Sequence, residues 1–527
     1  MNWNKETRVS EAFTGFSFHT LKAKPFIALL CILFPAFFSF VMLLRFHTPE
    51  DQFLSYFTDD FFYYLKIAMN IADHHRSSFD MLHDTNGYHP LWLALITLQY
   101  YLFGNTTALF ISIVIMISII NTLSFFIFLT IALKLTNHLV AAVASSIYSA
   151  TLMFTLSRTG MEVSLGILAL ALLALRLLQT PLEVQTRKQA IVTGLLISFA
   201  FLSRIDAILM PFLYICAGIV YPIKSRARLA MNTIYAGIGC IPIFFYLAFN
   251  HFYFSSALPI SGAAKQLKTG FFPSSSTLLG LFGFSGYNII FIWPIALSAL
   301  LYVVLSLSGR VRCPSGDRLV VTAVLLHPLV FYPLLAFRSD WALWAWYFYP
   351  IVMVGIVVLP ALLQLLLERL NSILINRLVL IGSIAVAIVT LQSIIPINPI
   401  AFQIYEAAKE LKEFSATHHG TFAMGDRAGT AGYLLDDPIV QLEGLVGDKQ
   451  MLQNIRAERN LNDVLKELNV RYYVATGGAF EGDCYTAHEP GQAGPKSPHM
   501  TGQFCQAPIH EFHVGPAETR IFEIGKQ

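Results

Sequence analysis

Two adjacent carboxylates, Asp59 and Asp60, open a polar stretch between segments of almost pure hydrocarbon. They precede a predicted amphipathic helix, Phe61 to Ala72, whose apolar side chains can lie along a membrane interface. Burial at such a rim raises the pKa of a carboxyl group, and a neighbouring carboxylate raises it further, so the pair suits a general base that takes a proton from a hydroxyl. Thr58 and the two aspartates are also good helix-capping residues, and chemistry alone leaves both interpretations open.

The composition places these carboxylates in a membrane protein. Of the 527 residues, 55% are hydrophobic and only 13% are charged, which lies outside the range of soluble globular proteins. The formal net charge is only +3, and lysine and arginine are spread over short loops rather than gathered in one basic patch. We therefore predict no nucleic-acid partner.

The apolar runs predict a mainly α-helical, polytopic transmembrane bundle of about 11 to 13 spans, given a bilayer core of about 30 Å. One run, His89 to Phe103, has only about fifteen residues, so it is expected to be re-entrant or juxtamembrane. The other runs are Pro25–Leu44, Thr107–Leu133, Leu139–Leu156, Val163–Leu178, Ala190–Ser203, Ala207–Val220, Leu229–Phe249, Tyr287–Leu307, Leu319–Phe337, Tyr347–Leu367 and Leu378–Ile395.

Basic residues in short loops predict the topology, because they mark the cytoplasmic side. Lys5, Arg8, Lys22 and Lys24 precede the first run, which is a full span with no cleavage site after it, so the N-terminus is expected in the cytoplasm. Later basic residues fall in alternate loops: Lys134, Arg176 with Arg187 and Lys188, Lys224 with Arg226 and Arg228, Arg310 with Arg312 and Arg318, and Arg369 with Arg377. The opposite, outer face then receives 57–92, 157–162, 204–206, 252–265, 338–346 and everything after 395.

The composition shifts near Pro396, which predicts two domains, 1–396 in the membrane and 397–527 as a small α/β domain outside it. The first outer loop, 45–89, carries the Asp pair. Helical patterns cover 404–417 and 449–468, and extended patterns cover 421–426, 470–475 and 519–524. Cys484 and Cys505 lie in a Gly/Pro-rich part of this tail and either pair, closing a loop of about 20 residues, or stay as free thiols. Cys31, Cys216 and Cys240 are expected to be packing residues within spans.

Several motifs in chain order resemble those of the GT-C glycosyltransferases, which include protein O-mannosyltransferases, lipid A aminoarabinose transferases, oligosaccharyltransferase catalytic subunits and bacterial arabinofuranosyltransferases. The first outer loop carries "TDDFFYYLKIAMNIA" and "TNGYHPLW". Further matches are "SRTGMEVSL" with Glu162, "LSRIDAIL" with Arg204 and Asp206, "SSALPISGAAK" with Lys265, "SDWALWAWYFYP", and "GDRAGTAGYLLDDPIVQLEGLVGD" in the tail. Two features depart from the family pattern: His74, His75 and Arg76 stand where small residues are common, and Ser261 where an Asn is common.

The resemblance implies catalytic and donor-binding roles for particular residues. Asp59 matches the catalytic carboxylate and is predicted to take the proton of the acceptor hydroxyl, while Asp60 orients it. Arg204, Lys265 and Arg338 are predicted to neutralise charge on the donor phosphate, although each has the alternative of a snorkelling or ion-paired residue at a helix end. Glu162 and Asp206 are assigned to sugar hydroxyls, with a divalent cation possible but not favoured. His89 either contacts phosphate or caps the next helix, and Tyr64 is an aromatic candidate for the donor sugar.

These expectations combine into one predicted function. An inverting enzyme moves a single sugar, arabinofuranose being one candidate, from a polyprenyl-phosphate donor to a glycan, lipid or surface-protein acceptor. It does so on the outer, periplasmic face of a bacterial cytoplasmic membrane, without a cofactor. In the tail, Asp426, Asp436, Asp437 and Glu443 are interpreted as solvated or turn residues. The alternative is a transporter or flippase for a lipid-linked sugar, which should carry polar residues near the membrane midplane.

Overall fold

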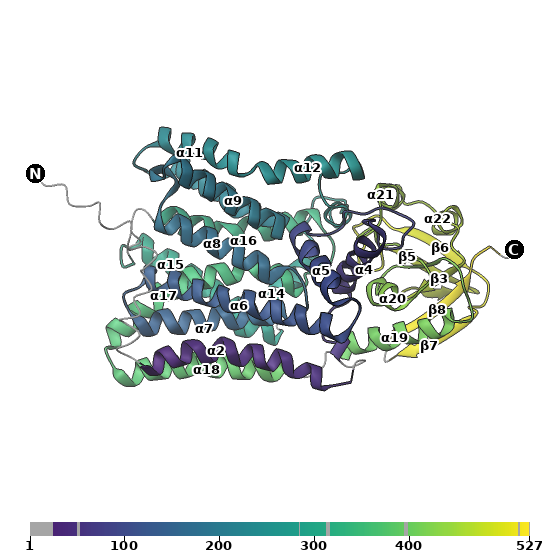
Figure 1. Cartoon of the computed structure of the whole chain (residues 1–527), viewed down its shortest axis with the longest axis horizontal. Helices are drawn as coiled ribbons and strands as arrows, with labels where there is room; N and C mark the ends of the chain where they lie inside the picture. Colours follow the sequence, from purple (N-terminus) through teal and green to yellow (C-terminus); the bar gives the residue numbers. More distant parts are fainter. Residues whose placement is uncertain are drawn as a thin grey trace, which may run out of the picture.

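The computed structural model describes residues 25–49, 53–283, 285–311, 317–394, 399–514 and 517–525. The basic residues Lys5, Arg8, Lys22, Lys24 and Arg312 lie outside these ranges, and so does the predicted domain boundary at 396–397. Figure 1 shows a bundle of long helices with a smaller α/β domain, formed by the C-terminal residues, at one end of it.

Every apolar run of the sequence forms a helix, because such runs bury their side chains against one another or face lipid. The bundle helices are α2 (Pro25–Leu44), α6 (Thr107–Leu135), α7 (Leu139–Ser157), α8 (Val163–Gln179), α9 (Arg187–Ser203), α10 (Leu209–Val220), α11 (Arg226–Gly239), α12 (Ile241–Phe254), α15 (Trp293–Leu307), α16 (Arg318–Arg338), α17 (Tyr349–Leu370) and α18 (Ile373–Ile394). A π-helical turn, η5 (Asn288–Ile292), leads into α15, and α14 (Ser275–Phe282) is a short helix before it.

The sequence predicts about 11 to 13 spans, and fewer helices meet the length and apolar composition of a full span. Within the described residues, seven helices are long and apolar enough to cross a membrane, or eight if α11 and α12, bent by 51°, count as one span. Three predicted spans, α8, α9 and α10, have only 17, 17 and 12 residues. Helix α8 is buried along almost its whole length by its neighbours, so its apolar sequence reflects packing inside the bundle as well as contact with lipid.

Two helices, α4 (Asp59–His74) and α5 (Pro90–Phe103), lie where the bundle meets the C-terminal domain (Figure 1). Helix α4 begins two residues before the predicted start, with both aspartates in its first turn, where negative charge favours a helix. It ends at His75, whose left-handed backbone closes the last turn. Helix α5 has 14 residues, which agrees with the expectation that 89–103 does not cross the membrane.

The C-terminal domain contains two sheets with helices packed on them. The larger sheet has the strand order β2-β1-β3-β8-β7, in which β1 is parallel to β2 and β3, and β8 is antiparallel to β3 and β7. The smaller sheet, β4-β5-β6, is antiparallel. The elements are α19 (Pro399–Ser415), β1 (Phe422–Met424), α20 (Ala428–Leu434), β2 (Ile439–Gln441), α21 (Lys449–Arg456), α22 (Leu461–Glu467), β3 (Tyr472–Ala475), β4 (Ala479–Glu481), β5 (Cys484–Glu489), β6 (Met500–Phe504), β7 (His510–Val514) and β8 (Ala517–Glu523).

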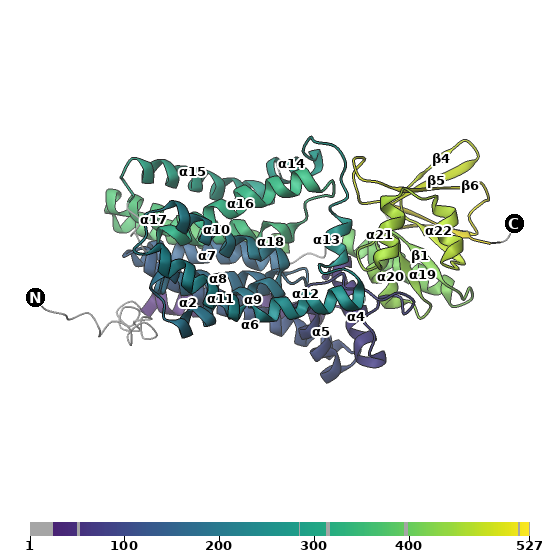
Figure 2. The ribbon, with the colours of Figure 1, turned by 90° about the horizontal axis from the view of Figure 1, so that it is seen from above.

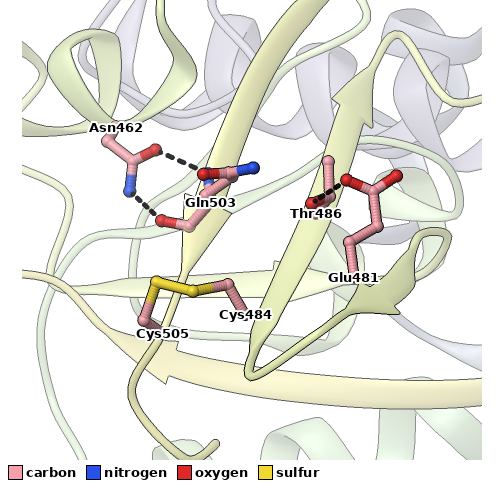
Figure 3. Close-up of a disulfide and its surroundings, with 6 residues drawn as sticks. All are labelled: Asn462, Glu481, Cys484, Thr486, Gln503 and Cys505. Carbon is pink, nitrogen blue, oxygen red and sulfur yellow. Dashed lines mark hydrogen bonds between the residues drawn. A yellow bond between two sulfur atoms is a disulfide. The ribbon is translucent and has the colours of Figure 1, made fainter.

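The predicted helical and extended patterns of the tail are confirmed, but one predicted helix is divided, and α20, β2, β7 and the smaller sheet were not predicted. The single helix predicted over 449–468 is two helices, because Asn460 caps α22 by accepting a hydrogen bond from the Asp463 backbone N–H at 3.2 Å. The smaller sheet forms in the part of the tail that the sequence marks only as Gly/Pro-rich. Cys484 and Cys505 form a disulfide that ties β5 to the end of β6 (Figure 3), as one of the two alternatives predicted. Asn462 holds the same region to α22 through two 3.0 Å hydrogen bonds with the Gln503 backbone.

The C-terminal domain docks closely on loops at one end of the bundle, which the sequence predicts to face outward. The Asp340 carboxylate accepts a 2.9 Å hydrogen bond from the Lys496 backbone N–H, and the Thr269 N–H donates to the Lys496 carbonyl at 2.7 Å. A Cβ at Gly87 would lie 1.9 Å from the Leu445 carbonyl oxygen, so the first outer loop touches the domain backbone directly. Helix α13 (Ile260–Ala264) contacts α21 on another side (Figure 2).

Candidate active site

Asp59 joins the two domains. Its Oδ2 accepts a hydrogen bond from the Gly429 backbone N–H at 3.0 Å, and its Oδ1 accepts from the Thr430 N–H and the Thr430 hydroxyl, each at 2.7 Å. Gly429 and Thr430 lie in the first turn of α20, whose free N–H groups need such acceptors. Burial raises the pKa of Asp59 to about 6, against the opposing effect of the hydrogen bonds from Thr430. Asp59 therefore does cap a helix, but that helix is α20 of the C-terminal domain and not α4, as the sequence suggested.

Asp60 presents its carboxylate to a different environment. Successive side chains of a helix point about 100° apart, and Asp60 makes no hydrogen bond to any residue in the described part of the chain. Its electrostatic neighbours are Lys265, Glu162 and Asp426. Burial raises the pKa of Asp60, Lys265 lowers it, and the two carboxylates raise it further. Asp60 is therefore a half-buried carboxylate whose oxygens can still accept a hydrogen bond or a proton.

A buried charge network lies next to Asp60. Arg204 Nη1 contacts Glu162 Oε1 at 2.6 Å, and Arg204 Nε lies 2.9 Å from Asp206 Oδ1; the Glu162 and Arg204 side chains are each only 2% exposed. The Arg204 guanidinium also lies over the rings of Tyr349 and Tyr347, at 4.7 and 5.4 Å from their centres. Local structure places these groups: Glu162 precedes α8, Arg204 ends α9, and Asp206 lies in the following turn, η4 (Ile205–Ile208).

Tyr64 and His89 orient the network. The Tyr64 hydroxyl donates to Glu162 Oε2 at 3.2 Å and accepts from the His89 backbone N–H at 3.2 Å. His89 Nδ1 accepts from the Ile205 N–H at 3.3 Å, which leaves Nε2 to carry the proton toward Glu162 Oε1, 3.4 Å away. Burial lowers the pKa of His89. His89 occupies the N-cap position of α5, where its carbonyl accepts from the Leu93 N–H at 3.1 Å, but its side chain makes no capping bond.

Lys265 completes the cluster and Arg338 does not. The Lys265 ammonium lies 5.6 Å from the centre of the Trp341 ring and 5.9 Å from that of Tyr347. Burial lowers the pKa of Lys265, but Tyr347 and Asp60 outweigh that effect and the net pKa is raised, so the lysine stays charged. Arg338 is exposed at the end of α16 and takes part in none of these contacts. Position in a loop on the predicted outer face was therefore not enough to bring it to the cluster.

Asp426 and Glu443 of the C-terminal domain are electrostatic neighbours of Asp60. The sequence had predicted solvated or turn residues at both positions. Glu443 is only 2% exposed and accepts hydrogen bonds from the Gln492 N–H at 3.1 Å and the Gln441 amide at 3.3 Å. Burial raises the pKa of Glu443 well above its usual value, and Asp426, Glu489 and Asp60 add to the effect. Both residues lie inside the tail motif quoted above, and that placement was the signal available in the sequence.

Two other polar clusters are separate from the site. Among the described residues, Glu511, His513 and Glu518 bring three atoms that could bind a metal within 4.8 Å of one another. They are mostly exposed, at the edge of the larger sheet. A cleft of about 440 Å³ lies where α4, α19 and α20 meet, and its lining includes Lys66 and Lys412 but none of the cluster residues described above.

No family model matches the sequence, and no curated protein matches it significantly. Solved structures do match. The oligosaccharyltransferase of Archaeoglobus fulgidus, in a complex with Zn and sulfate, superposes with a TM-score of 0.54 at 12% identity over 84% of this chain and 68% of that one. ArnT from Cupriavidus metallidurans, bound to undecaprenyl phosphate, superposes with a TM-score of 0.51 at 13% identity over 84% of this chain and 92% of that one. This chain has the GT-C fold. The fold expected from the sequence motifs is thereby confirmed.

The arabinofuranosyltransferase-like branch receives no such support. AftD from mycobacteria matches with a TM-score of 0.47 at 14% identity, over 96% of this chain and 40% of that one. A likeness of that degree does not distinguish arabinose from other sugars. Asp60 lies in α4 and Lys265 directly follows α13, and both helices lie at the end of the bundle that the C-terminal domain covers (Figure 2).

Proposed function

We propose that this protein is a glycosyltransferase that moves a sugar from a polyprenyl-phosphate donor to an acceptor hydroxyl. The observation that carries the proposal is the Asp60 carboxylate with the charged Lys265 as its electrostatic neighbour. Lys265 and Arg204, which pairs with the buried Glu162, both lie over the ring of Tyr347. Two fold neighbours support the donor class: ArnT was solved with undecaprenyl phosphate, and the A. fulgidus enzyme AglB with an inhibitory peptide and a dolichol-phosphate.

The reaction follows from what these two side chains can do. The acceptor oxygen attacks the anomeric carbon of the donor sugar, and the bond from that carbon to the phosphate oxygen breaks. Asp60 takes the hydroxyl proton as the new bond forms. The electron pair of the broken bond stays on the polyprenyl phosphate, whose added negative charge Lys265 stabilises in a partly buried site. In-line attack of this kind inverts the configuration at the anomeric carbon.

We assign the base to Asp60, whereas the sequence motif suggested Asp59. Both oxygens of Asp59 already accept hydrogen bonds, three in all, from α20. Protonation of Asp59 would weaken those bonds, and an acceptor hydroxyl would have to compete with them. Asp60 has no such partners in the described part of the chain, and burial raises its pKa toward the range useful for a general base.

Glu162, Arg204 and Asp206 form a buried scaffold in this proposal, because each satisfies the charge of another. Tyr64 and His89 hold Glu162 in place, and direct contacts with the substrates are proposed for Lys265, with the donor phosphate, and Asp60, with the acceptor hydroxyl. The acceptor remains a cell-envelope glycan, a lipid or a surface protein, and arabinofuranose remains one candidate sugar. A location on the periplasmic face of a bacterial cytoplasmic membrane fits the distribution of basic loops.

A transport function has less support. A transporter of this size should carry paired repeats and a polar site near the midplane of broken helices. The cluster described here lies at one end of the bundle, where α4 and the C-terminal domain meet (Figure 1).

Purified protein in nanodiscs tests the proposal. A panel of polyprenyl-phosphate sugars is supplied with envelope extract as acceptor, and products are identified by mass spectrometry. We expect transfer from one donor, lost by at least 100-fold in Asp60→Asn, with donor consumption and product formation in a 1:1 ratio. Full activity of Asp60→Asn would remove the proposed base, and absence of transfer from every polyprenyl-phosphate sugar would remove the donor class.

A further inference from the structure

We infer that Asp59 is a positioning residue, whose carboxylate holds helix α20 of the C-terminal domain against α4 and thereby fixes the segment just before α20, which carries Asp426, near the Asp59–Asp60 pair. The inference rests on the proposed function, since it assigns Asp59 a task in the same site. The C-terminal domain is then part of the reaction chamber, and its alignment sets how an acceptor meets the base.

The contact between Asp59 and α20 requires that the two helices approach closely. All three donors to Asp59 come from two consecutive residues, Gly429 and Thr430, and both are buried. A Cβ at Gly429 would lie 2.2 Å from the Asp59 backbone oxygen and 2.9 Å from its Oδ2, which is closer than real Cβ atoms come to such atoms. Gly429 is thus required by space, and a substitution there would separate the two helices without altering either carboxylate.

The position of α20 governs the site directly. Asp426 lies two residues before α20, between that helix and strand β1, and it is an electrostatic neighbour of both Asp59 and Asp60. A displaced α20 therefore moves Asp426 relative to Asp60.

The remaining docking contacts limit how far the domain can move. The hydrogen bond from the Lys496 N–H to Asp340 and the backbone contact between Gly87 and Leu445 lie on other segments. Loss of Asp59 should therefore loosen α20 locally while the domain stays attached. The expected signature is local amide exposure together with poorer acceptor binding, which a proton-accepting role for Asp59 would not produce.

Hydrogen exchange at residues 428–434, measured in the full chain in nanodiscs, reports on the contact. We expect Asp59→Asn and Gly429→Ala each to speed exchange there at least 10-fold and to raise KM for the acceptor more than they lower kcat. Thr430→Val, which removes the 2.7 Å hydroxyl bond, should show a smaller effect of the same kind, and Thr430→Ser should keep the protection. Gly477→Ala is the matched control, because a Cβ at that glycine of the same domain meets open space.

The outcomes separate this inference from the proposed function. Asp60→Asn should abolish transfer and leave exchange at 428–434 unchanged. If Asp59→Asn abolishes kcat while exchange and acceptor KM stay at wild-type values, Asp59 is the base and the inference is wrong. If Asp59→Asn and Gly429→Ala leave exchange and both kinetic constants unchanged, the inference also fails, whereas the assignment of Asp60 stands or falls on its own variant.

Discussion

The buried pair of Glu162 and Arg204 gives the sharpest prediction about what holds the site together. Each side chain is only 2% exposed, and the two are 2.6 Å apart. Among the described residues, Glu162→Gln leaves the buried Arg204 charge with Asp206, 28% exposed, as its remaining acidic partner. Removing one member of a buried pair costs about 3–5 kcal/mol. We expect the lower end, about 3 kcal/mol, because Asp206 still offsets part of the charge.

A double-mutant cycle checks this magnitude. Arg204→Met alone should cost about as much as Glu162→Gln, because it leaves Glu162 buried without its cation. The double variant has no such charge left, so its loss in unfolding free energy should fall short of the sum of the single losses by about 2–3 kcal/mol. The assay is denaturant unfolding in detergent micelles. The exposed pair Arg459–Glu467, 2.5 Å apart on the C-terminal domain, is the control with similar contact and little expected coupling.

Additive losses in that cycle, or single losses no larger than those of the exposed pair, would refute the reasoning. They would mean that water reaches Glu162 and Arg204, and that the pair is not shielded from solvent in the folded protein.

Two further predictions concern the donor and the C-terminal domain. Lys265→Met should raise KM for the polyprenyl-phosphate donor by roughly 10- to 100-fold, the equivalent of a lost charge-assisted hydrogen bond, and leave KM for the acceptor unchanged. The measurement is steady-state kinetics in nanodiscs with each substrate varied in turn. An equal rise in both KM values would contradict the prediction. Burial raises the pKa of Glu489 from 4.5 to about 7, so the folded protein takes up a proton between those values and stability should fall by up to roughly 3 kcal/mol as pH rises from 4.5 to 7. Glu489→Gln should flatten that part of the profile of melting temperature against pH, and an unchanged slope would show that Glu489 is ionised in the folded domain.

The sequence predicted the helices of the bundle well because each is an uninterrupted apolar run. Helix α2, for example, has the predicted bounds. The apolar pattern does not separate long spans from shorter buried helices, since a helix buried among its neighbours, such as α8, is as apolar as one that faces lipid. The smaller sheet of the C-terminal domain was missed because its strands have only three, six and five residues and the connection between β5 and β6 is rich in glycine and proline.

The site was predictable in its residue types and only partly in its roles. The motif pointed to the pair Asp59 and Asp60, but which of the two is free depends on the rotation of α4 and on partners at 429–430, about 370 residues later in the chain. Glu443 illustrates the same limit, because nothing local in the sequence marks it as buried. Arg338 shows the converse, since a residue in the expected loop ends up exposed.

The most direct test of the central claim is a structure of Asp60→Asn in nanodiscs with its polyprenyl-phosphate sugar bound. The account predicts that the donor phosphate lies within about 4 Å of Lys265 Nζ, with the anomeric carbon between that phosphate and residue 60. A phosphate seated instead in the cleft that Lys66 and Lys412 line, or on the far end of the bundle, would contradict it.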